Sequence, residues 1–507
     1  MEDPEWAEAQ KIIISIDLIA KTKKHLQFLK VVDDNGKLYN GSILERAIFR
    51  YKYYWLPLLA KHSQCKVREW QLVVPLDCEW IWHCHRLNPV QYVADCKELF
   101  GRILDPCGIV ISSIEGTCKK KSQEFWNKMH PQEPYELKLD NCFDNDIENK
   151  LISSPSTKYD LVSAVKRQSS FYYQVSRGFM EDDDYLEGAV QRYKGFLHLI
   201  RRNMESKLEN FCVPTYDIDL VWHTHQLHAL SYYNDTVSLL GKVLDHDDTD
   251  SNRTKDEKLD VGFSRTTKQW KEVFSSRYWR AGAMYRDVVA GPRYVASLHG
   301  PTYPTNPIQS SKITLFVEIL MEIIEVRNLS SNHKGNLVLY VSKQQHDMLF
   351  KGKSQLTIST ATEETQALLF QCEPKGDLLF ELIDDSSKSL GTCSLSLSKL
   401  DSKLATAKWL EFESGLPLPV TLGIVISTTH PSLAQHIPTK SGGNDCGTLS
   451  VMTYAWATGG MCSGSGGCGG GCGGGGGGGG CRASCAGCHS NCGGGCRGGG
   501  GGNCSSK

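Results

Sequence analysis

The feature that most constrains this chain is a long internal repeat. The stretch EWIWHCHRL at 79–87 returns as DLVWHTHQL at 219–227. Other matches surround it: DLI at 17–19 with DLV at 160–162, RYK at 50–52 and again at 192–194, and LFGRILD at 99–105 with LLGKVLD at 239–245. The offset between matched residues stays between 143 and 139. A period this long indicates a duplicated unit rather than a solenoid, with copies at about 9–105 and 152–245.

Each copy is predicted to be helical. Ser42 with Glu45, and Asp184 with Glu187, have the spacing of a capping box, which predicts a helix start at both positions. Behind them, apolar residues recur at helical spacing; in the first copy these include Leu44, Ile48, Tyr51 and Trp55, and in the second Leu186, Val190, Tyr193 and Leu197. A later helix in each copy is expected to carry the Trp-His-x-His element.

Two residues apart on a helix, His83 and His85 point to nearly opposite sides and cannot both bind one ion. The acid one turn earlier is different, because Glu79 with His83 and Asp219 with His223 share a face. If the two copies pack about a pseudo-two-fold axis, these four side chains converge on a site for Zn, Mn or Fe. This is the metal hypothesis.

The alternative is structural. Each acid would hold its histidine in one tautomer, while the other motif residues pack in the core of each copy; these are Trp82, His85, Trp222 and His225. A catalytic pair requires an asymmetric site that a near-symmetric duplication does not offer, so no catalytic residue is assigned. Cys84 matches Thr224, so thiolate ligation is not part of the shared design.

Composition limits the function further. Lys+Arg and Asp+Glu number 56 and 57 among 507 residues, so the whole chain has no electrostatic footprint for nucleic acid or an anionic membrane. The first ten residues, MEDPEWAEAQ, lack the pattern of a secretory signal. We therefore expect a soluble intracellular protein, cytoplasmic with the nucleus as a second compartment, in which the 20 cysteines are reduced.

The remaining segments differ in character. Residues 106–151 read as a polar spacer, and 262–290 as a helical extension that continues through Trp270, Phe274 and Trp279. From 312 to 428, short runs of strand composition predict an antiparallel sandwich whose order resembles a C2 domain. One candidate loop holds Asp384 and Asp385 but the other offers no acid, so we expect protein contact rather than calcium-dependent membrane binding.

Two weaker signals concern RNA and metals. The stretch KGNLVLYV at 334–341 can be laid on an RNA-recognition pattern, but only Lys334 and Gly335 fit it. The tail, 459–507, is rich in glycine and is expected to be disordered. Its nine cysteines could bind soft metals or crosslink on oxidation.

The order of a duplicated Trp-His-x-His region, a C2-like sandwich and a glycine-rich tail resembles the plant glycine-rich domain-containing protein family. The stretches that carry the resemblance are VPLDCEWIWHCHRLNP, VPTYDIDLVWHTHQLH and YWRAGAMYR. The resemblance implies a non-enzymatic regulator in stress, abscisic-acid or auxin-linked development, sometimes credited with an RNA-binding motif.

The sequence thus predicts a multidomain protein: a mainly α, duplicated N-terminal region, an all-β C2-like sandwich, and a disordered Gly/Cys-rich tail. We expect a regulatory or scaffold protein with protein partners and no required cofactor. Two alternatives stay open, an RNA-binding regulator and a metal-dependent protein or enzyme centred on Glu79, His83, Asp219 and His223.

Overall fold

The computed structural model describes residues 3–64, 71–105, 109–110, 117–137, 155–208, 210–247, 249–250, 252–285, 313–329, 333, 335–344, 354–359, 366–400, 402, 405–413, 418–435 and 452–455. The glycine-rich tail predicted at 459–507 lies outside these residues. Among those described, no helix is both long and apolar enough to cross a membrane.

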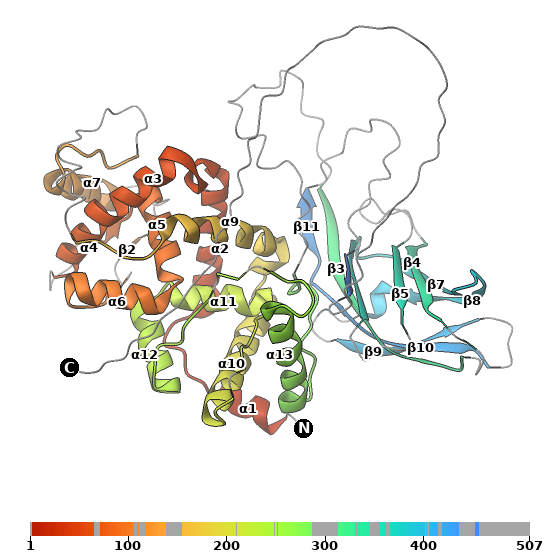
Figure 1. Ribbon diagram of the computed structural model, residues 1–507. Helices are drawn as coiled ribbons and strands as arrows, with labels where there is room; N and C mark the ends of the chain where they lie inside the picture. The colour runs from red at the N-terminus through yellow and green to blue at the C-terminus, as the bar shows by residue number, and fades with distance from the viewer. Residues whose placement is uncertain are drawn as a thin grey trace, which may run out of the picture. The chain divides into compact units, whose positions relative to one another are not determined.

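The two copies are built from matching helices (Figure 1). The first copy contains α2 (Leu18–Asp34), α3 (Gly41–Arg50), the π-helical turn η2 (Tyr51–Trp55), α4 (Leu56–Ser63), α5 (Leu76–Arg86) and α6 (Pro89–Phe100). The second contains α9 (Leu161–Val175), α10 (Asp183–Glu205), α11 (Tyr216–Gln226) and α12 (Ala229–Leu240). A single long helix, α10, therefore stands where the first copy has α3, η2 and α4.

Several helices of the two copies end or begin at matching positions, because the same residue type forms the cap in both. Asp17 and Asp160 cap α2 and α9 through their side chains, which satisfies an amide of the first turn. Gly101 and Gly241 end α6 and α12 with φ of 70° and 75°, a left-handed conformation that glycine adopts without penalty. The helices that carry the histidines, α5 and α11, occupy equivalent places.

The predicted capping boxes are wrong. Asn40 precedes α3 without a side-chain cap, so Ser42 already lies inside the helix. Asp182 caps α10 by accepting from the Tyr185 amide at 3.0 Å, which places Asp184 in the first turn. There the negative charge of Asp184 still interacts favourably with the helix dipole. The pattern located both helices but placed their starts too late in the chain.

Further helices flank the copies. The spacer contains α7 (Thr117–Met129), whose Trp126 is fully buried, and a short parallel pairing of β1 (Leu72–Val73) with β2 (Ile109–Val110). The predicted extension is α13 (Lys258–Phe274), which ends where Ser275 turns left-handed at φ 50°. Trp279 is therefore buried from an irregular segment rather than from the expected helix. Short 3₁₀ turns occur at η1 (Gly36–Tyr39) and η3 (Gly178–Glu181).

The N-terminal helix joins the second copy rather than the first. Trp6 of α1 (Pro4–Gln10) meets Trp270 and Phe274 of α13 edge-on at 5.9 and 5.4 Å. Ala9, Ile12 and Leu18 also belong to the apolar core around α10 and α13. The two copies are thus interlocked by the start of the chain.

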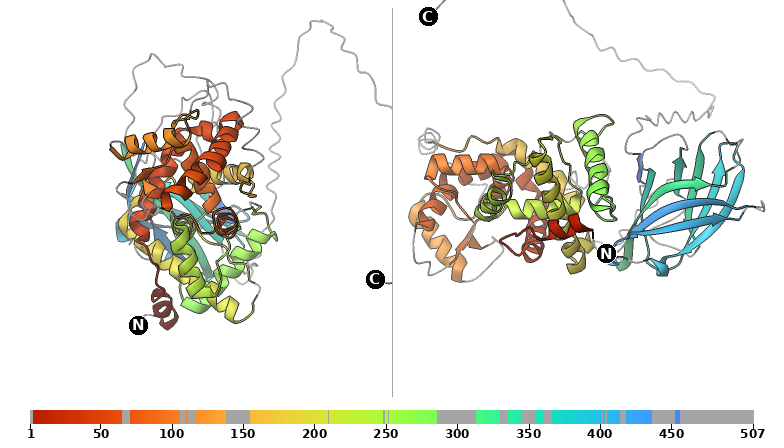
Figure 2. Two further views of the ribbon diagram at one scale, coloured as in Figure 1. Left: turned by 90° about the vertical axis from the view of Figure 1, so that its left-hand side faces the viewer. Right: turned by 90° about the horizontal axis from the view of Figure 1, so that it is seen from below.

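The C-terminal part is a sandwich of two antiparallel sheets (Figure 2). One sheet has the order β12-β6-β3-β10-β9, with β11 also paired to β3; its strands are β3 (Ile313–Arg327), β6 (Gln366–Cys372), β9 (Thr406–Phe412), β10 (Val420–Thr428), β11 (Ser432–Gln435) and β12 (Met452–Ala455). The other has the order β5-β4-β7-β8, formed by β5 (Ser354–Ile358), β4 (Leu337–Lys343), β7 (Asp377–Asp384) and β8 (Ser389–Ser396), with the turn η4 (Leu397–Lys399) after it. Alternating side chains of both sheets form one apolar core.

A buried ion pair links the sandwich to the helices. Arg177, just after α9, donates to both carboxylate oxygens of Glu318 in β3 at 2.7 Å. The backbone amide of Gly282 donates to the same carboxylate at 2.9 Å. Gly282 has φ 82° and lies against Phe179, so a β-carbon there would be both strained and obstructed.

Candidate functional site

The second histidine of each motif is part of a buried network that is the same in both copies. His85 Nδ1 lies 2.8 Å from the Tyr51 hydroxyl, and its Nε2 lies 3.2 Å from Asp95. In the second copy, His225 lies 3.0 Å from the Tyr193 hydroxyl and 3.1 Å from Asp235. Both imidazoles are 0% exposed, so no ligand can reach them. These histidines fasten three helices of each copy together.

Burial sets the protonation of these groups. It lowers the pKa of His85 and of His225, and the neighbouring carboxylates oppose that shift only in part. The pKa of Asp95 and of Asp235 is lowered, because the hydrogen bonds they accept outweigh the effect of their burial. Each pair is therefore a carboxylate that accepts from a neutral imidazole.

The tryptophans before the histidines are also duplicated structural elements. The Trp82 indole donates to the Tyr92 hydroxyl at 2.9 Å, and this hydroxyl donates to the Leu104 carbonyl at 2.6 Å. Trp222 repeats the chain through Tyr232 to Leu244, with both bonds at 2.9 Å. The structural interpretation of the sequence motif therefore fits these residues.

The first histidine differs between the copies. In the first copy, His83 Nε2 lies 2.9 Å from His25 Nε2 on α2. The Thr224 hydroxyl donates to the Leu220 carbonyl, so it must accept from His25 Nδ1, 3.0 Å away. His25 Nε2 then accepts from His83. Burial, together with the neighbouring cationic groups, lowers the pKa of both histidines well below the ordinary value.

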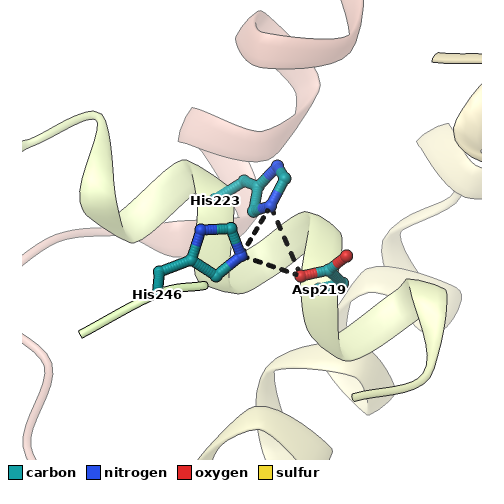
Figure 3. Close-up of side chains that lie close together, drawn as sticks. All are labelled: Asp219, His223 and His246. Carbon is teal, nitrogen blue, oxygen red and sulfur yellow. Dashed lines mark hydrogen bonds and ion pairs between the residues drawn. The ribbon is translucent and has the colours of Figure 1, made fainter. Parts of the chain in front are cut away.

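In the second copy, the first histidine belongs to a group of three possible metal ligands, Asp219, His223 and His246 (Figure 3). His223 Nε2 lies 3.2 Å from His246 Nε2 and 3.4 Å from an Asp219 carboxylate oxygen. His246 Nε2 is 3.8 Å from the same oxygen. Burial would raise the pKa of Asp219, but the two neighbouring histidines lower it below the ordinary value. The group thus offers a carboxylate and two imidazoles.

These three side chains line a cavity of about 860 Å³ in the second copy. Its wall combines aromatic residues such as Phe171, Tyr216 and Trp222 with polar ones such as Gln168. The histidines are buried, and 18% of the Asp219 side chain is exposed. A concave, partly apolar pocket with a few converging polar groups is the usual form of a small-ligand site.

The two copies meet at the ends of their motifs. The Arg86 guanidinium donates to the Leu227 carbonyl at 2.5 Å, from the first motif to the second. In the other direction, His246 Nδ1 donates to the Leu87 carbonyl at 2.9 Å. The backbone of the first copy thus orients His246, which lines the cavity of the second copy.

The structure divides the four predicted metal ligands into two sets. Asp219 and His223 lie together, as their spacing predicts, and their third partner is His246. Glu79 and His83 lie outside this group, because His83 faces His25 instead. His246 was missed, since it comes from the segment after α12. The repeat contained a signal for this residue. GKVLDH at 241–246 aligns with GRILDP at 101–106, so His246 stands where the first copy has Pro106.

The residues weighed for RNA and calcium have structural contacts. Lys334 lies outside the described residues, while Gly335 has φ 127° in the turn before β4, where a β-carbon would collide with Asp385. Asp385 accepts from the Asn336 amide at 2.8 Å. One carboxylate oxygen of Asp384 accepts from the Ser386 amide and hydroxyl and from the Lys388 amide. Both acids are therefore engaged in the loops that they shape.

Known proteins resemble the chain over most of its length. The family model "Glycine-rich domain-containing protein-like" matches residues 2–95 and 91–235, and "C2 domain of glycine-rich domain-containing protein" matches 313–430. Glycine-rich domain-containing proteins 1 and 2 of Arabidopsis thaliana are 51% and 49% identical to the chain. Each alignment covers 84% of this chain, against 55% and 56% of the relatives, so the chain spans about half of their length.

Among solved structures, a C2 domain of plant Extended Synaptotagmin 1 aligns with 23% of this chain and 96% of its own, at 12% identity and a TM-score of 0.19. The family models supply the assignment. With its duplicated helical region and its C2 domain both matched, the chain belongs to the glycine-rich domain-containing protein family.

Proposed function

We propose that this chain is a non-enzymatic regulatory or scaffold protein that binds other proteins through its C2-like sandwich. The observation that carries the proposal is an exposed patch on the sheet formed by β3, β10 and β9, made by Trp409 and Arg327. Trp409 is 46% exposed there. Tryptophan and arginine are the residues most enriched among the energetic centres of protein interfaces.

The patch is held in a fixed arrangement. The Arg327 guanidinium stacks over the Trp409 ring at 3.9 Å, and Glu325 forms an ion pair with Arg327. Gly423 lies beneath the ring, where the β-carbon of any other residue would come within 3.0 Å of it. A preorganised aromatic anchor loses little conformational freedom on binding.

Two further observations support this function. The His85 and His225 networks are sealed and identical in both copies, as expected of structural groups and not of a catalytic pair. Asp384 and Asp385, the acids at the calcium-binding end of the predicted sandwich, already accept backbone hydrogen bonds, Asp384 from Lys388 in its own turn and Asp385 from Asn336 before β4. These contacts favour recognition without calcium.

Family membership is what supports a biological setting for this proposal. We assign the regulation to plant stress and hormone responses, including those to abscisic acid and auxin. This setting rests on the family and not on a site of the chain.

The test places a photo-crosslinking amino acid at position 411, which is exposed two residues from Trp409 on β9. The full chain is expressed in plant cells and irradiated. We expect a discrete set of crosslinked proteins, depleted at least fivefold by Trp409→Ala. Ile13→Ala, which removes an 84% exposed side chain from the helical region, is the matched control and should leave the set unchanged. Crosslinks to RNA alone, or proteins recovered equally with Trp409→Ala, would contradict the proposal.

A further inference from the structure

The cavity of the second copy contains a feature that partner binding by the sandwich does not explain. We propose that Asp219, His223 and His246 bind one divalent transition-metal ion, zinc in the first place, with a coordination position open to the cavity.

The spacing of the three ligand atoms supports this site. A tetrahedral zinc ion with bonds of about 2.0–2.1 Å holds its ligands roughly 3.3 Å apart. The three distances here are 3.2, 3.4 and 3.8 Å. An ion at the centre of this triangle would need only small side-chain shifts. One carboxylate and two imidazoles form a donor set typical of zinc and ferrous sites that leave room for water or substrate.

The hydrogen bonds around His246 provide a second, independent observation. A carbonyl can only accept, so His246 Nδ1 carries the proton that binds the Leu87 carbonyl. Its Nε2 therefore presents a lone pair to His223 and Asp219. Metal-binding histidines commonly donate their other nitrogen to a carbonyl or carboxylate in this way, which fixes the ring and its tautomer.

The duplication shows how the site differs from its counterpart. His223 matches His83, and Phe171 packs on His223 at 4.3 Å, as Phe28 packs on His83 at 5.5 Å. Around this shared frame, the differences between the copies include His25 against Gln168, Trp80 against Leu220, and Pro106 against His246. In the first copy the histidine faces another histidine in a closed core. In the second it faces a carboxylate and a different histidine, His246, at the wall of a cavity.

One other group of possible ligands exists among the described residues, formed by Asp182, Asp184 and His430. Asp182 is engaged as the N-cap of α10, and His430 Nε2 lies 4.0 Å from the exposed Asp184. This group serves as the matched control for the proposed site.

The test uses the full chain, because the Leu87 carbonyl of the first copy orients His246. Accessible thiols are alkylated under native conditions, which removes the tail cysteines as competing ligands. The protein is then stripped with a chelator and titrated with Zn²⁺ and with Co²⁺. We expect one equivalent of either ion, visible absorption of tetrahedral Co²⁺, and X-ray absorption fine structure with imidazole but no sulfur scattering.

Variants assign the site. His246→Ala and His223→Asn should each weaken affinity by at least about 100-fold, more than the 10–100-fold typical of changes outside the ligand set. His430→Asn should retain full affinity. Circular dichroism and thermal unfolding establish that each variant is folded. If His246→Ala does not fold, His246→Gln takes its place. No bound ion in the alkylated chain, unchanged affinity in the folded variants, or loss of binding only in His430→Asn would overturn the proposal. None of these outcomes depends on Trp409, so the metal site and the protein-binding function fail separately.

Discussion

His246 Nδ1 lies 2.9 Å from the carbonyl oxygen of Leu87, so the last residue of the first motif orients a histidine of the second copy. Arg86 returns the connection by donating to the Leu227 carbonyl. The Trp-His-x-His elements are therefore not two independent fixtures. Their ends are the contact through which one half of the helical region organises the other.

The Arg86 contact gives a direct test of this connection. Arg86→Gln installs the residue found at the matching position, Gln226. The Leu227 carbonyl loses its donor, and the cation over the Trp82 ring, now 4.0 Å from its centre, is removed. We expect a loss of about 1–3 kcal/mol in the free energy of unfolding, measured by urea denaturation. Stability equal to that of the native chain would show that the bond is dispensable.

The buried networks predict equal effects in both copies. His85→Gln and His225→Gln each break the bonds to a tyrosine and an aspartate inside the core. A buried group left without its partner costs about 1–3 kcal/mol, so both variants should lower the melting temperature by similar amounts. A large effect in one copy with none in the other would contradict a shared structural role.

Acid should weaken the helical region through its buried histidines. The pKa values of His25, His83 and His85 are lowered by burial, so the unfolded chain binds more protons than the folded one below the ordinary value of 6.5. The free energy of unfolding is therefore highest above pH 6.5, where these histidines are neutral in both states, and it decreases as the pH falls toward their folded pKa values. Unfolding followed between pH 7 and 5 should show this decline. His85→Gln should reduce its slope.

Glu322 should act in the opposite direction. Burial raises its pKa to about 7 despite the opposing charge of Arg277, which lies 3.0 Å away. The folded chain therefore binds the extra proton between pH 4.5 and 7, and its favourable contribution is lost as the pH rises through 7. Glu322→Gln should be more stable than the native chain at pH 8, and this advantage should shrink toward pH 5. An advantage that is constant with pH would show that the carboxyl is not the cause.

The ion pair between Arg177 and Glu318 should show strong coupling. Removing one partner leaves the other charge buried, which typically costs about 3–5 kcal/mol. Arg177→Met and Glu318→Met should each destabilise the chain, and the double variant should lose less than the sum of the two. A double-mutant cycle by denaturant unfolding measures this coupling. Additive losses would mean that the charges do not interact.

Local patterns predicted the elements well and their ends less well. The helical faces through Tyr51 and Tyr193 follow from the spacing of apolar residues within a single segment. The helix starts were not predicted correctly, because several residues that can cap a helix lie close together. Asn40 rather than Ser42 precedes α3, and Asp182 rather than Asp184 caps α10. The continuation of α13 through Trp279 also failed, since Ser275 adopts a left-handed conformation that its residue type does not announce.

The site required tertiary information. The spacing of Asp219 and His223 predicts a shared face because both lie on one helix. His246 and His25 come from other segments, and no periodicity relates them to the motif. The assumed symmetry of the copies also misled, since it paired Glu79 and His83 with Asp219 and His223 although the two environments have diverged.

The exchange of Pro106 for His246 at matched positions has an evolutionary consequence. In a protein with an internal duplication, each copy can be compared with the other copy in the same molecule. What both halves preserve, such as the tyrosine–histidine–aspartate networks, is what the shared architecture could not lose. Where the halves differ, one of them is open to specialisation, because the other half can continue to meet the shared structural requirement. By this criterion, the neighbourhood of His246 is where natural variation in the family should concentrate any change of activity.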